Sequence, residues 1–253
     1  MPAAQAETCI LDTDGDGIAD GTGGATDNGS VDTNLACGTD ATASGSASAT
    51  AIGADSIADG LGATALGFNA EAAADFAVAL GGQALAEGAN STAVGDFATA
   101  GANDTVAVGA DAAAIAEDAT AIGENSFAAS EGATAIGEAS VATGFQSTAL
   151  GENAVASGDN AIAIGVDIDS DGDGASATAA GAIAIGADAS AGFANSVAIG
   201  QGAASTRANQ VALGTASNTV TLPGITSTES ASAQSGPVEL VTTDASGNLA
   251  SDG

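Results

Sequence analysis

The sequence lacks most of the side chains that build catalytic sites and thick cores. It has no Trp, no Tyr and no His, and only 6 Phe among 253 residues. Without large side chains the chain cannot fill a wide interior at native packing density, so we expect a thin core of small residues. Its single basic residue is Arg207, so general acid–base chemistry would fall to carboxylates alone, which makes an enzyme the least favoured class.

Positive charge is almost absent. Arg207 stands against 32 Asp and Glu, which gives a formal net charge of −31. Nucleic-acid binding needs clustered cations, and anionic lipid surfaces repel such a chain, so both are excluded as partners. The same field attracts cations, divalent ones above all, and is also typical of a protein adapted to salty water.

Long apolar runs and most cysteines are missing too. No stretch of about 20 apolar residues occurs, so nothing in the sequence spans a membrane as a helix. Ala4-Gln5-Ala6 has the small-x-small form of a signal cleavage site, so we expect a secreted chain trimmed just upstream. The two cysteines, Cys9 and Cys37, have no metal-ligand partners, which predicts a disulfide formed in an oxidising compartment.

The sequence does contain a strong repeat of 14 residues. Ala, a branched aliphatic residue and Gly recur together, always in phase except for one interval of 21 residues. The repeat glycines are Gly53, Gly67, Gly81, Gly95, Gly109, Gly123, Gly137, Gly151, Gly165, Gly186, Gly200 and Gly214. Such a period indicates an array in which each repeat is one structural unit.

Each repeat predicts two short β-strands. The third, fifth and seventh residues after the glycine are almost always small, whereas the fourth, sixth and eighth vary and accept Asp or Glu. This alternation is typical of a strand with one buried and one solvent-facing side. A second strand leads up to the next glycine, as in Thr64-Ala65-Leu66. The glycine content and the alternation rule out a helical array, and the regular β-branched positions rule out disorder.

The middle residue of the second strand is Ala in all twelve copies. A solvent-facing position would vary, so we expect this Ala face to be buried closely against a partner surface outside the coil. Copies of the chain would then press their Ala ladders together around a symmetry axis. The repeat therefore predicts an all-β parallel solenoid of 14-residue turns, which at about 4.8 Å per turn forms a rod of roughly 55 Å.

The repeat resembles a known family. Asn195-Ser196-Val197-Ala198-Ile199-Gly200 is similar to the signature hexapeptide of YadA-like head repeats in trimeric autotransporter adhesins, and residues 91–95 and 147–151 are close variants. The resemblance implies a left-handed parallel β-roll, a homotrimer, and a place at the cell surface, anchored in the outer membrane through a coiled-coil stalk and a β-barrel. It also implies attachment to host matrix, cells, abiotic surfaces or sister bacteria.

The resemblance divides the chain into three parts. Residues 1–37 form an acidic N-terminal cap, 38–214 the head repeats with an insertion at 166–174, and 215–253 a connector from head to stalk. A hairpin is predicted over Val238 to Leu249. Stalk heptads and membrane strands are absent from the sequence, so we expect anchoring through further segments. The acidity is unlike heads that bind collagen or acidic matrix, and the ligand stays open.

The cap contains a candidate calcium loop with the pattern D-x-D-x-D-G. Its carboxylates are Asp12, Asp14, Asp16 and Asp20. Alternating carboxylates converge on one hard cation, although Gly23 stands where an EF-hand has its Glu. The alternative is a solvated turn. Cys9 and Cys37 bracket the loop, so we expect their disulfide to staple the cap.

The insertion contains a second acidic run. Its carboxylates are Asp167, Asp169, Asp171 and Asp173. Calcium binding and a solvated acidic loop are both compatible with this pattern. The insertion adds seven residues to one turn, so we expect the coil to bulge once and then to recover its phase.

The phenylalanines fall at six different positions of the repeat. They are Phe68, Phe76, Phe97, Phe127, Phe145 and Phe193. They form no ladder, so we expect no aromatic platform for glycans and assign them to filling local gaps. An adhesin head is the favoured function, and a passive spacer or an extracellular fibre segment is the alternative, because both need only a stiff trimer.

Overall fold

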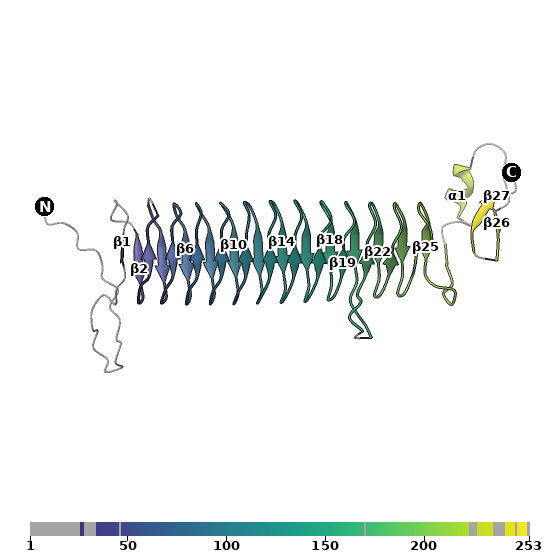
Figure 1. The fold of residues 1–253 in the computed structure, drawn as a ribbon. Coiled ribbons are helices and arrows are strands. Elements are labelled where there is room, and N and C mark those ends of the chain that lie inside the picture. The colour runs from purple at the N-terminus through teal and green to yellow at the C-terminus, as the bar shows by residue number, and fades with distance from the viewer. Residues whose placement is uncertain are drawn as a thin grey trace. The chain divides into compact units, whose positions relative to one another are not determined.

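The computed structural model describes residues 26–27, 34–45, 47–169, 171–222, 227–234, 241–245 and 247–251. They fall into two units, one within Met1–Ser217 and one within Asn218–Gly253. The first unit is a parallel β-solenoid whose short strands stack into two sheets (Figure 1). In the part of the chain that the structure describes, no helix is long and apolar enough to cross a membrane.

The first sheet has 12 strands of two residues each. They are β1 (Thr26–Asp27), β3 (Thr42–Ala43), β5 (Ile57–Ala58), β7 (Glu71–Ala72), β9 (Leu85–Ala86), β11 (Thr99–Ala100), β13 (Ala113–Ala114), β15 (Phe127–Ala128), β17 (Val141–Ala142), β19 (Val155–Ala156), β21 (Ser176–Ala177) and β23 (Ser190–Ala191). They follow one another in chain order, and each pairs in parallel with its neighbours.

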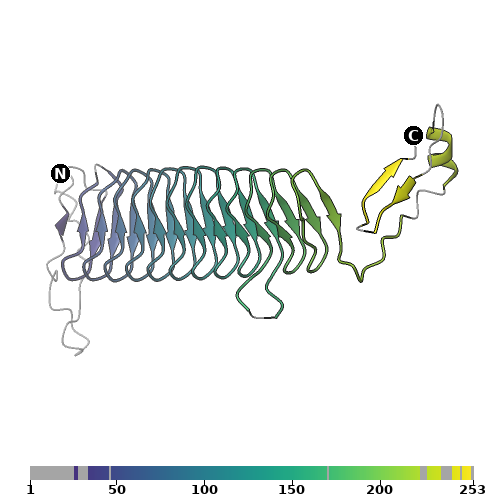
Figure 2. The same cartoon turned by 45° about the vertical axis from the view of Figure 1, so that its right-hand side comes forward.

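The second sheet has 13 strands of three residues each. They are β2 (Leu35–Cys37), β4 (Thr50–Ile52), β6 (Thr64–Leu66), β8 (Val78–Leu80), β10 (Thr92–Val94), β12 (Val106–Val108), β14 (Thr120–Ile122), β16 (Thr134–Ile136), β18 (Thr148–Leu150), β20 (Ile162–Ile164), β22 (Ile183–Ile185), β24 (Val197–Ile199) and β25 (Val211–Leu213). Figure 2 shows the stack of coils along which both sheets run, and successive strands of the chain alternate between the two sheets.

Neighbouring coils pair residue for residue. Ala93 of β10 lies opposite Ala107 of β12, which is one repeat further along the chain. The predicted all-β solenoid with a 14-residue period is therefore confirmed. Across the interval of 21 residues, β19 pairs with β21 and β20 with β22, so the coil recovers its phase after the insertion as expected.

Each coil turns back on itself at two β-turns. In one coil the N–H of Ala70 donates to the carbonyl of Gly67 at 3.4 Å, and the N–H of Ala77 donates to that of Ala74 at 3.1 Å. The third residue of each turn has a positive φ. Gly67 itself has φ 144°, and a Cβ added there would lie 2.2 Å from the carbonyl oxygen of Gly81 in the next coil. The repeat glycine is therefore required both by its backbone conformation and by the close approach of the coils.

The interior of the coil contains almost nothing larger than a methyl group. Among the described residues, every fully buried apolar side chain is Ala, and the largest fully buried side chain of any kind is that of Thr105. Buried hydroxyls such as those of Ser126 and Ser140 donate to the glycine carbonyls of their own turns, at 2.8 and 2.9 Å. The expectation of a thin core of small residues is confirmed.

The constant Ala of the second strand belongs to this interior. Ala65, Ala79 and Ala93 are fully buried within a single chain. The prediction that this Ala ladder faces a neighbouring copy is therefore wrong. The two sheets of one coil lie so close that only a methyl group fits between them, so the coil's own interior keeps the position constant. The opposite face of the same strands points outward and carries the aliphatic side chains.

The second unit contains helix α1 (Thr228–Ala233) and an antiparallel pair formed by β26 (Val241–Thr243) and β27 (Leu249–Ser251). The connecting turn is held by the N–H of Gly247, which donates to the carbonyl of Asp244 at 3.0 Å. A hairpin is thus present close to the position predicted from the sequence.

Candidate functional site

The outward face of the 13-stranded sheet carries two columns of uncharged side chains, one aliphatic throughout and one made of Thr, Val and Ile. In β12, the side chains of Val106 and Val108 lie outward and half-buried on either side of the fully buried Ala107. The first residues of the strands β4 to β25 are Thr50, Thr64, Val78, Thr92, Val106, Thr120, Thr134, Thr148, Ile162, Ile183, Val197 and Val211. The third residues are Ile52, Leu66, Leu80, Val94, Val108, Ile122, Ile136, Leu150, Ile164, Ile185, Ile199 and Leu213. We call these two columns the aliphatic strip.

Much of the aliphatic strip is exposed in the single chain. Leu66 is 46%, Leu150 42% and Ile199 40% exposed, and no charged residue interrupts either column. With strands about 4.8 Å apart, the twelve levels of the strip span roughly 53 Å along the rod. A contiguous apolar surface of this kind marks a site that another molecule covers.

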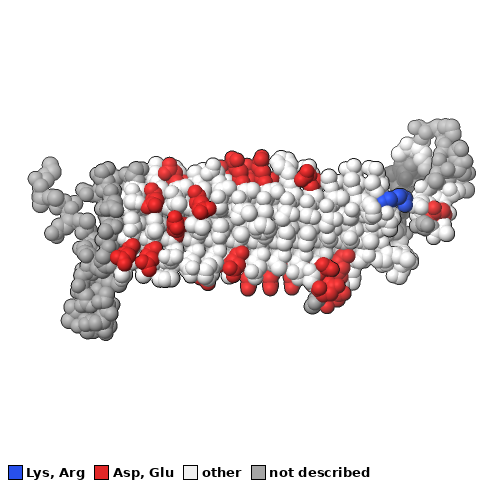
Figure 3. Space-filling view, in the orientation of Figure 1, with Lys and Arg blue, Asp and Glu red and all other residues white. Residues whose placement is uncertain are grey.

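The carboxylates avoid the aliphatic strip. Figure 3 shows Asp and Glu gathered mainly along two margins of the coil stack, where the chain bends. Some of them have a structural role, because Asp75 Oδ1 accepts a hydrogen bond from the N–H of Leu61 at 2.8 Å, and Asp159 Oδ1 accepts one from Phe145 at 3.1 Å. Each of these bonds joins one coil to the next at a bend.

The insertion 166–174 projects from the bend between β20 and β21 (Figures 1 and 2). The N–H of Ala175 donates to the carbonyl of Gly165 at 3.4 Å, which is the bond that closes an ordinary turn of the coil. The insertion is therefore an enlarged turn, and the strands on either side are not displaced.

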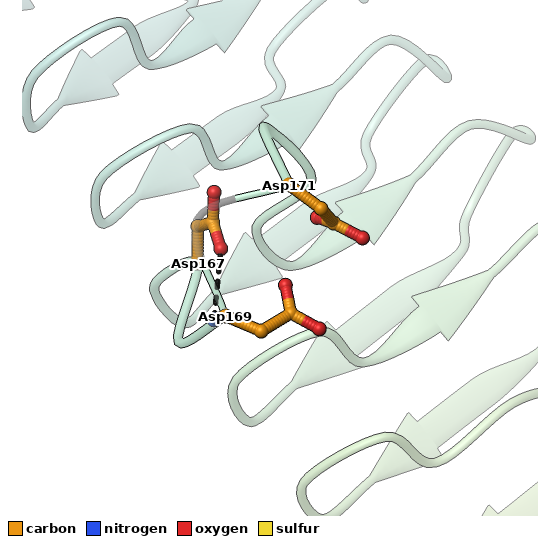
Figure 4. A group of neighbouring side chains, drawn as sticks. All are labelled: Asp167, Asp169 and Asp171. Atoms are coloured by element: carbon orange, nitrogen blue, oxygen red, sulfur yellow. Dashed lines mark hydrogen bonds between the residues drawn. The ribbon is translucent and has the colours of Figure 1, made fainter.

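Three of the four predicted carboxylates of this loop converge. One ligand oxygen from each of Asp167, Asp169 and Asp171 lies within 4.8 Å of the others (Figure 4). The carboxylate of Asp167 is held by the N–H groups of Asp169 and Gly172, at 3.2 and 2.8 Å. Within the described residues Asp173 stays outside this group, and its N–H donates to Asp171 at 3.0 Å.

The converging carboxylates repel one another. The charge of Asp171 raises the pKa of Asp169 above its ordinary value of 3.8, with smaller contributions from desolvation and from the charge of Asp188. Asp188 comes from the following coil, and its Oδ1 is enclosed without a hydrogen-bond partner among the described residues. A bound cation would offset this repulsion, and carboxylate oxygens are the ligands that calcium prefers.

The other predicted site residues lie outside the described part of the chain. They are Asp12, Asp14, Asp16, Asp20 and Cys9. Cys37 ends β2, at the first coil of the 13-stranded sheet. The calcium loop of the cap and the pairing of Cys9 with Cys37 stay predictions.

Five of the six phenylalanines are exposed and Phe127 is half-buried, so the expectation that they fill local gaps stays a prediction for the surface of the coil. Phe68 is 58%, Phe76 56%, Phe97 47%, Phe193 43% and Phe145 41% exposed. An interior that accepts only methyl groups has no room for a ring, so the rings lie outside. Phe97 lines a surface hollow, which the different repeat positions of the phenylalanines did not indicate.

Comparison with known proteins identifies a family. The family described as YadA head domain repeat (2 copies) matches residues 46–70, 58–84, 86–112, 114–138, 142–167, 172–189 and 177–203. Among solved structures the chain is similar to the crystal structure of the collagen-binding domain of the Yersinia adhesin YadA, at 22% identity and with a TM-score of 0.29. That match covers 78% of this chain and 74% of the other. No curated protein matches significantly.

The family match coincides with the coils of the solenoid. The matched segments span more than half of the chain and include every repeat glycine except Gly214. They also contain the strands of the 13-stranded sheet from β4 to β24, which carry nearly all of the aliphatic strip. The chain therefore belongs to the family of YadA head domain repeats.

Proposed function

We propose that this chain is the head of a trimeric surface adhesin. The observation that carries the proposal is the aliphatic strip, which a soluble head must cover, together with membership of a family of adhesin heads. The partner that fits the strip is another copy of the same chain, because the strip is uncharged along its whole length, has an aliphatic side chain at every level of its second column, and matches itself coil for coil. Family and fold are those of an adhesin rather than of an enzyme.

Cyclic symmetry about an axis parallel to the rod would bring one strip from each copy to the centre. The acidic bends would then lie away from the axis, where water and counter-ions screen them. Stability would grow with the number of coils, because each coil adds both a stacking contact and a contact between copies. The family resemblance supports three copies as the number in this assembly.

The assembly is tested by solution mass. Three chains of 23.2 kDa give about 70 kDa in sedimentation or light scattering. Ile122→Asp places a charge in the aliphatic strip and should reduce the mass to that of one chain or unfold the protein. Ile115→Asp is the matched control, because Ile115 is similarly exposed, at 46% against 37%, but lies next to β13 of the other sheet. A folded single chain in the wild type would contradict the proposal.

Adhesion itself is tested on surfaces. Beads coated with the trimer should attach to at least one of cultured cells, extracellular-matrix proteins, glass or plastic, or other beads of the same kind. The alternative function is a passive spacer or fibre segment, which predicts a trimer of the same mass and no attachment. The net charge of −31 favours neutral or basic surfaces over acidic matrix.

We place the head outside the cell, joined to the outer membrane by segments beyond the 253 residues of this chain. This placement rests on the family, whose adhesin character requires exposure at the surface. Antibody labelling of intact producing cells should stain their outside, and a protease added to those cells should remove the staining.

We further propose that the loop of residues 166–174 binds calcium. Asp167, Asp169 and Asp171 would supply ligand oxygens, and the enclosed Oδ1 of Asp188 would supply another. Calcium should raise the melting temperature of the head, and Asp171→Ala should reduce that rise. Asp159→Ala removes a carboxylate from another bend and should leave the rise intact. The same melting temperature with and without calcium would contradict this proposal.

A further inference from the structure

A shallow hollow of about 280 Å³ opens on the side of the 12-stranded sheet. Three successive coils contribute two side chains each to its wall. They are Asn69 and Glu71, Gln83 and Leu85, and Phe97 and Thr99.

The first column of the hollow comes from one of the two β-turns in each coil. Asn69, Gln83 and Phe97 are the third residues of their turns, with φ of 55°, 54° and 56°. Because their backbones have the same conformation and the coils stack in register, their side chains leave the chain in the same direction. The step between them is about 4.8 Å. Two amides and a ring therefore stand in a row along the rim.

The second column comes from the outward face of the sheet. Glu71, Leu85 and Thr99 are the first residues of β7, β9 and β11, and they pair in register. All three are half-buried. A carboxylate and a hydroxyl thus flank a central aliphatic side chain, which forms an apolar floor between two polar groups.

The polar groups of the hollow are available to a ligand. The side chains of Asn69, Gln83, Glu71 and Thr99 make no hydrogen bond within the described residues, in contrast to Asn103, which accepts one from the N–H of Ala89 at 2.9 Å. The ring of Phe97 is 47% exposed. A small concave surface with an exposed ring, an apolar floor and several unengaged polar groups fits a compact ligand that has apolar C–H faces and many hydroxyls.

We propose that this hollow binds one neutral pyranose unit of a glycan or polysaccharide. The C–H face of the sugar lies against Phe97 and Leu85. Its hydroxyls accept from the amides of Asn69 and Gln83 and donate to the carboxylate of Glu71. The charge of Glu71 and the acidic surroundings disfavour sialic and uronic acids. This inference rests on the proposed adhesin role, for which it supplies a ligand class.

The position of the hollow is compatible with the proposed trimer. The aliphatic strip belongs to the 13-stranded sheet, whereas the hollow lies on the outward face of the 12-stranded sheet and its adjoining turns. The combination of residues is confined to these coils. At the two positions concerned, three later coils have Asn125 and Phe127, Ala139 and Val141, and Asn153 and Val155.

Saturation-transfer NMR on the full chain tests the proposal. The probes are methyl glucopyranoside, methyl mannopyranoside, methyl galactopyranoside and N-acetylglucosamine, with glucuronic acid and N-acetylneuraminic acid as acidic counterparts. At least one neutral sugar should bind, with a Kd on the order of 1 mM as expected for a small open site. The acidic sugars should bind more weakly than that neutral sugar.

Variants locate the binding site. Phe97→Leu keeps an apolar side chain but removes the ring face, and should weaken binding about tenfold. Gln83→Ala should weaken it as well. Phe76→Ala is the matched control, because Phe76 has the same backbone conformation, with φ 59°, and similar exposure, at 56%, but lies at the opposite turn of the coil. Its affinity for the sugar should equal that of the wild type.

Three results would overturn the inference: no probe binds, acidic sugars bind as well as neutral ones, or Phe76→Ala weakens binding as much as Phe97→Leu. If coated beads attach to surfaces while no probe binds, the hollow loses its role and the adhesin proposal stands. Sugar binding without any attachment supports the hollow and contradicts the adhesin role.

Discussion

The methyl-lined interior makes Ala121→Val a decisive substitution. Ala121 is the middle residue of β14, is fully buried within one chain, and pairs in register with Ala107 and Ala135. The valine adds two methyl groups that point between the two sheets. The side chains above and below are alanines, which have no rotamers through which to make room.

The expected destabilisation follows from this geometry. Two buried methyl groups would contribute about 1.6 kcal/mol of hydrophobic stabilisation if space for them existed. Overpacking of a filled core costs roughly 1 to 3 kcal/mol and sometimes more. Because relief at Ala121 requires the backbones of both sheets to separate, we expect a net loss of about 3 kcal/mol, concentrated in the coils next to β14.

Denaturant unfolding followed by circular dichroism measures the loss, and hydrogen exchange locates it along the rod. Thr120→Val is the control, since Thr120 lies in the same strand but faces outward, in a column where Val106 already occurs. It should leave the unfolding free energy almost unchanged. A stable Ala121→Val protein would refute the close packing of the sheets. A loss that disappears at high protein concentration would place Ala121 between copies rather than inside the coil.

Three further predictions concern the turns and the acidic loop. Gly123→Ala puts a Cβ 2.4 Å from the carbonyl oxygen of Gly137 at a φ of 132°, so it should lower the unfolding free energy by about 3 kcal/mol or more in the same assay. Gly172→Ala is the control and should lower it by less, because its Cβ would meet no atom within 4 Å. Asp75→Ala leaves the N–H of Leu61 without its acceptor and should cost about 1 kcal/mol, whereas Asp75→Asn keeps an acceptor and should restore most of it. The raised pKa of Asp169 means that the folded loop takes up a proton at higher pH than the unfolded chain. Without metal, this carboxyl therefore stabilises the folded state at pH values below its ordinary pKa of 3.8, and this contribution is lost as the pH rises through the window just above 3.8. The rise in melting temperature caused by calcium should shrink as the pH falls into the same window, because protons then compete with the cation for the carboxylate.

The sequence predicted the period and the strands because both depend on local chemistry. Only glycine fits where coils approach as closely as at Gly67 and Gly81, so the repeat was visible without a structure. The acids were also placed correctly at variable positions, since a carboxylate cannot enter an interior made of methyl groups. The loop around Asp167 was expected as a bulge, because seven added residues leave the later glycines in phase.

The orientation of the second strand was not predictable in the same way. Alternation shows that Thr64 and Leu66 share one face and that Ala65 lies on the other, but it does not say which face is inside. Large apolar residues usually mark the interior, and here the distance between the sheets excludes them. The sequence also did not predict the hollow near Phe97. The hollow combines a turn position with a strand position of the repeat, and the residues at either position alone form no recognisable pattern.

The in-register stacking of the coils allows the length of the solenoid to change by whole coils. In the described solenoid, each coil bonds to the coils before and after it mainly through backbone groups that recur from level to level. Duplicating or deleting one 14-residue unit would lengthen or shorten the molecule by about 4.8 Å without requiring compensating changes elsewhere. A solenoid of this kind can change its length in small equal steps, while the surfaces displayed along it vary independently.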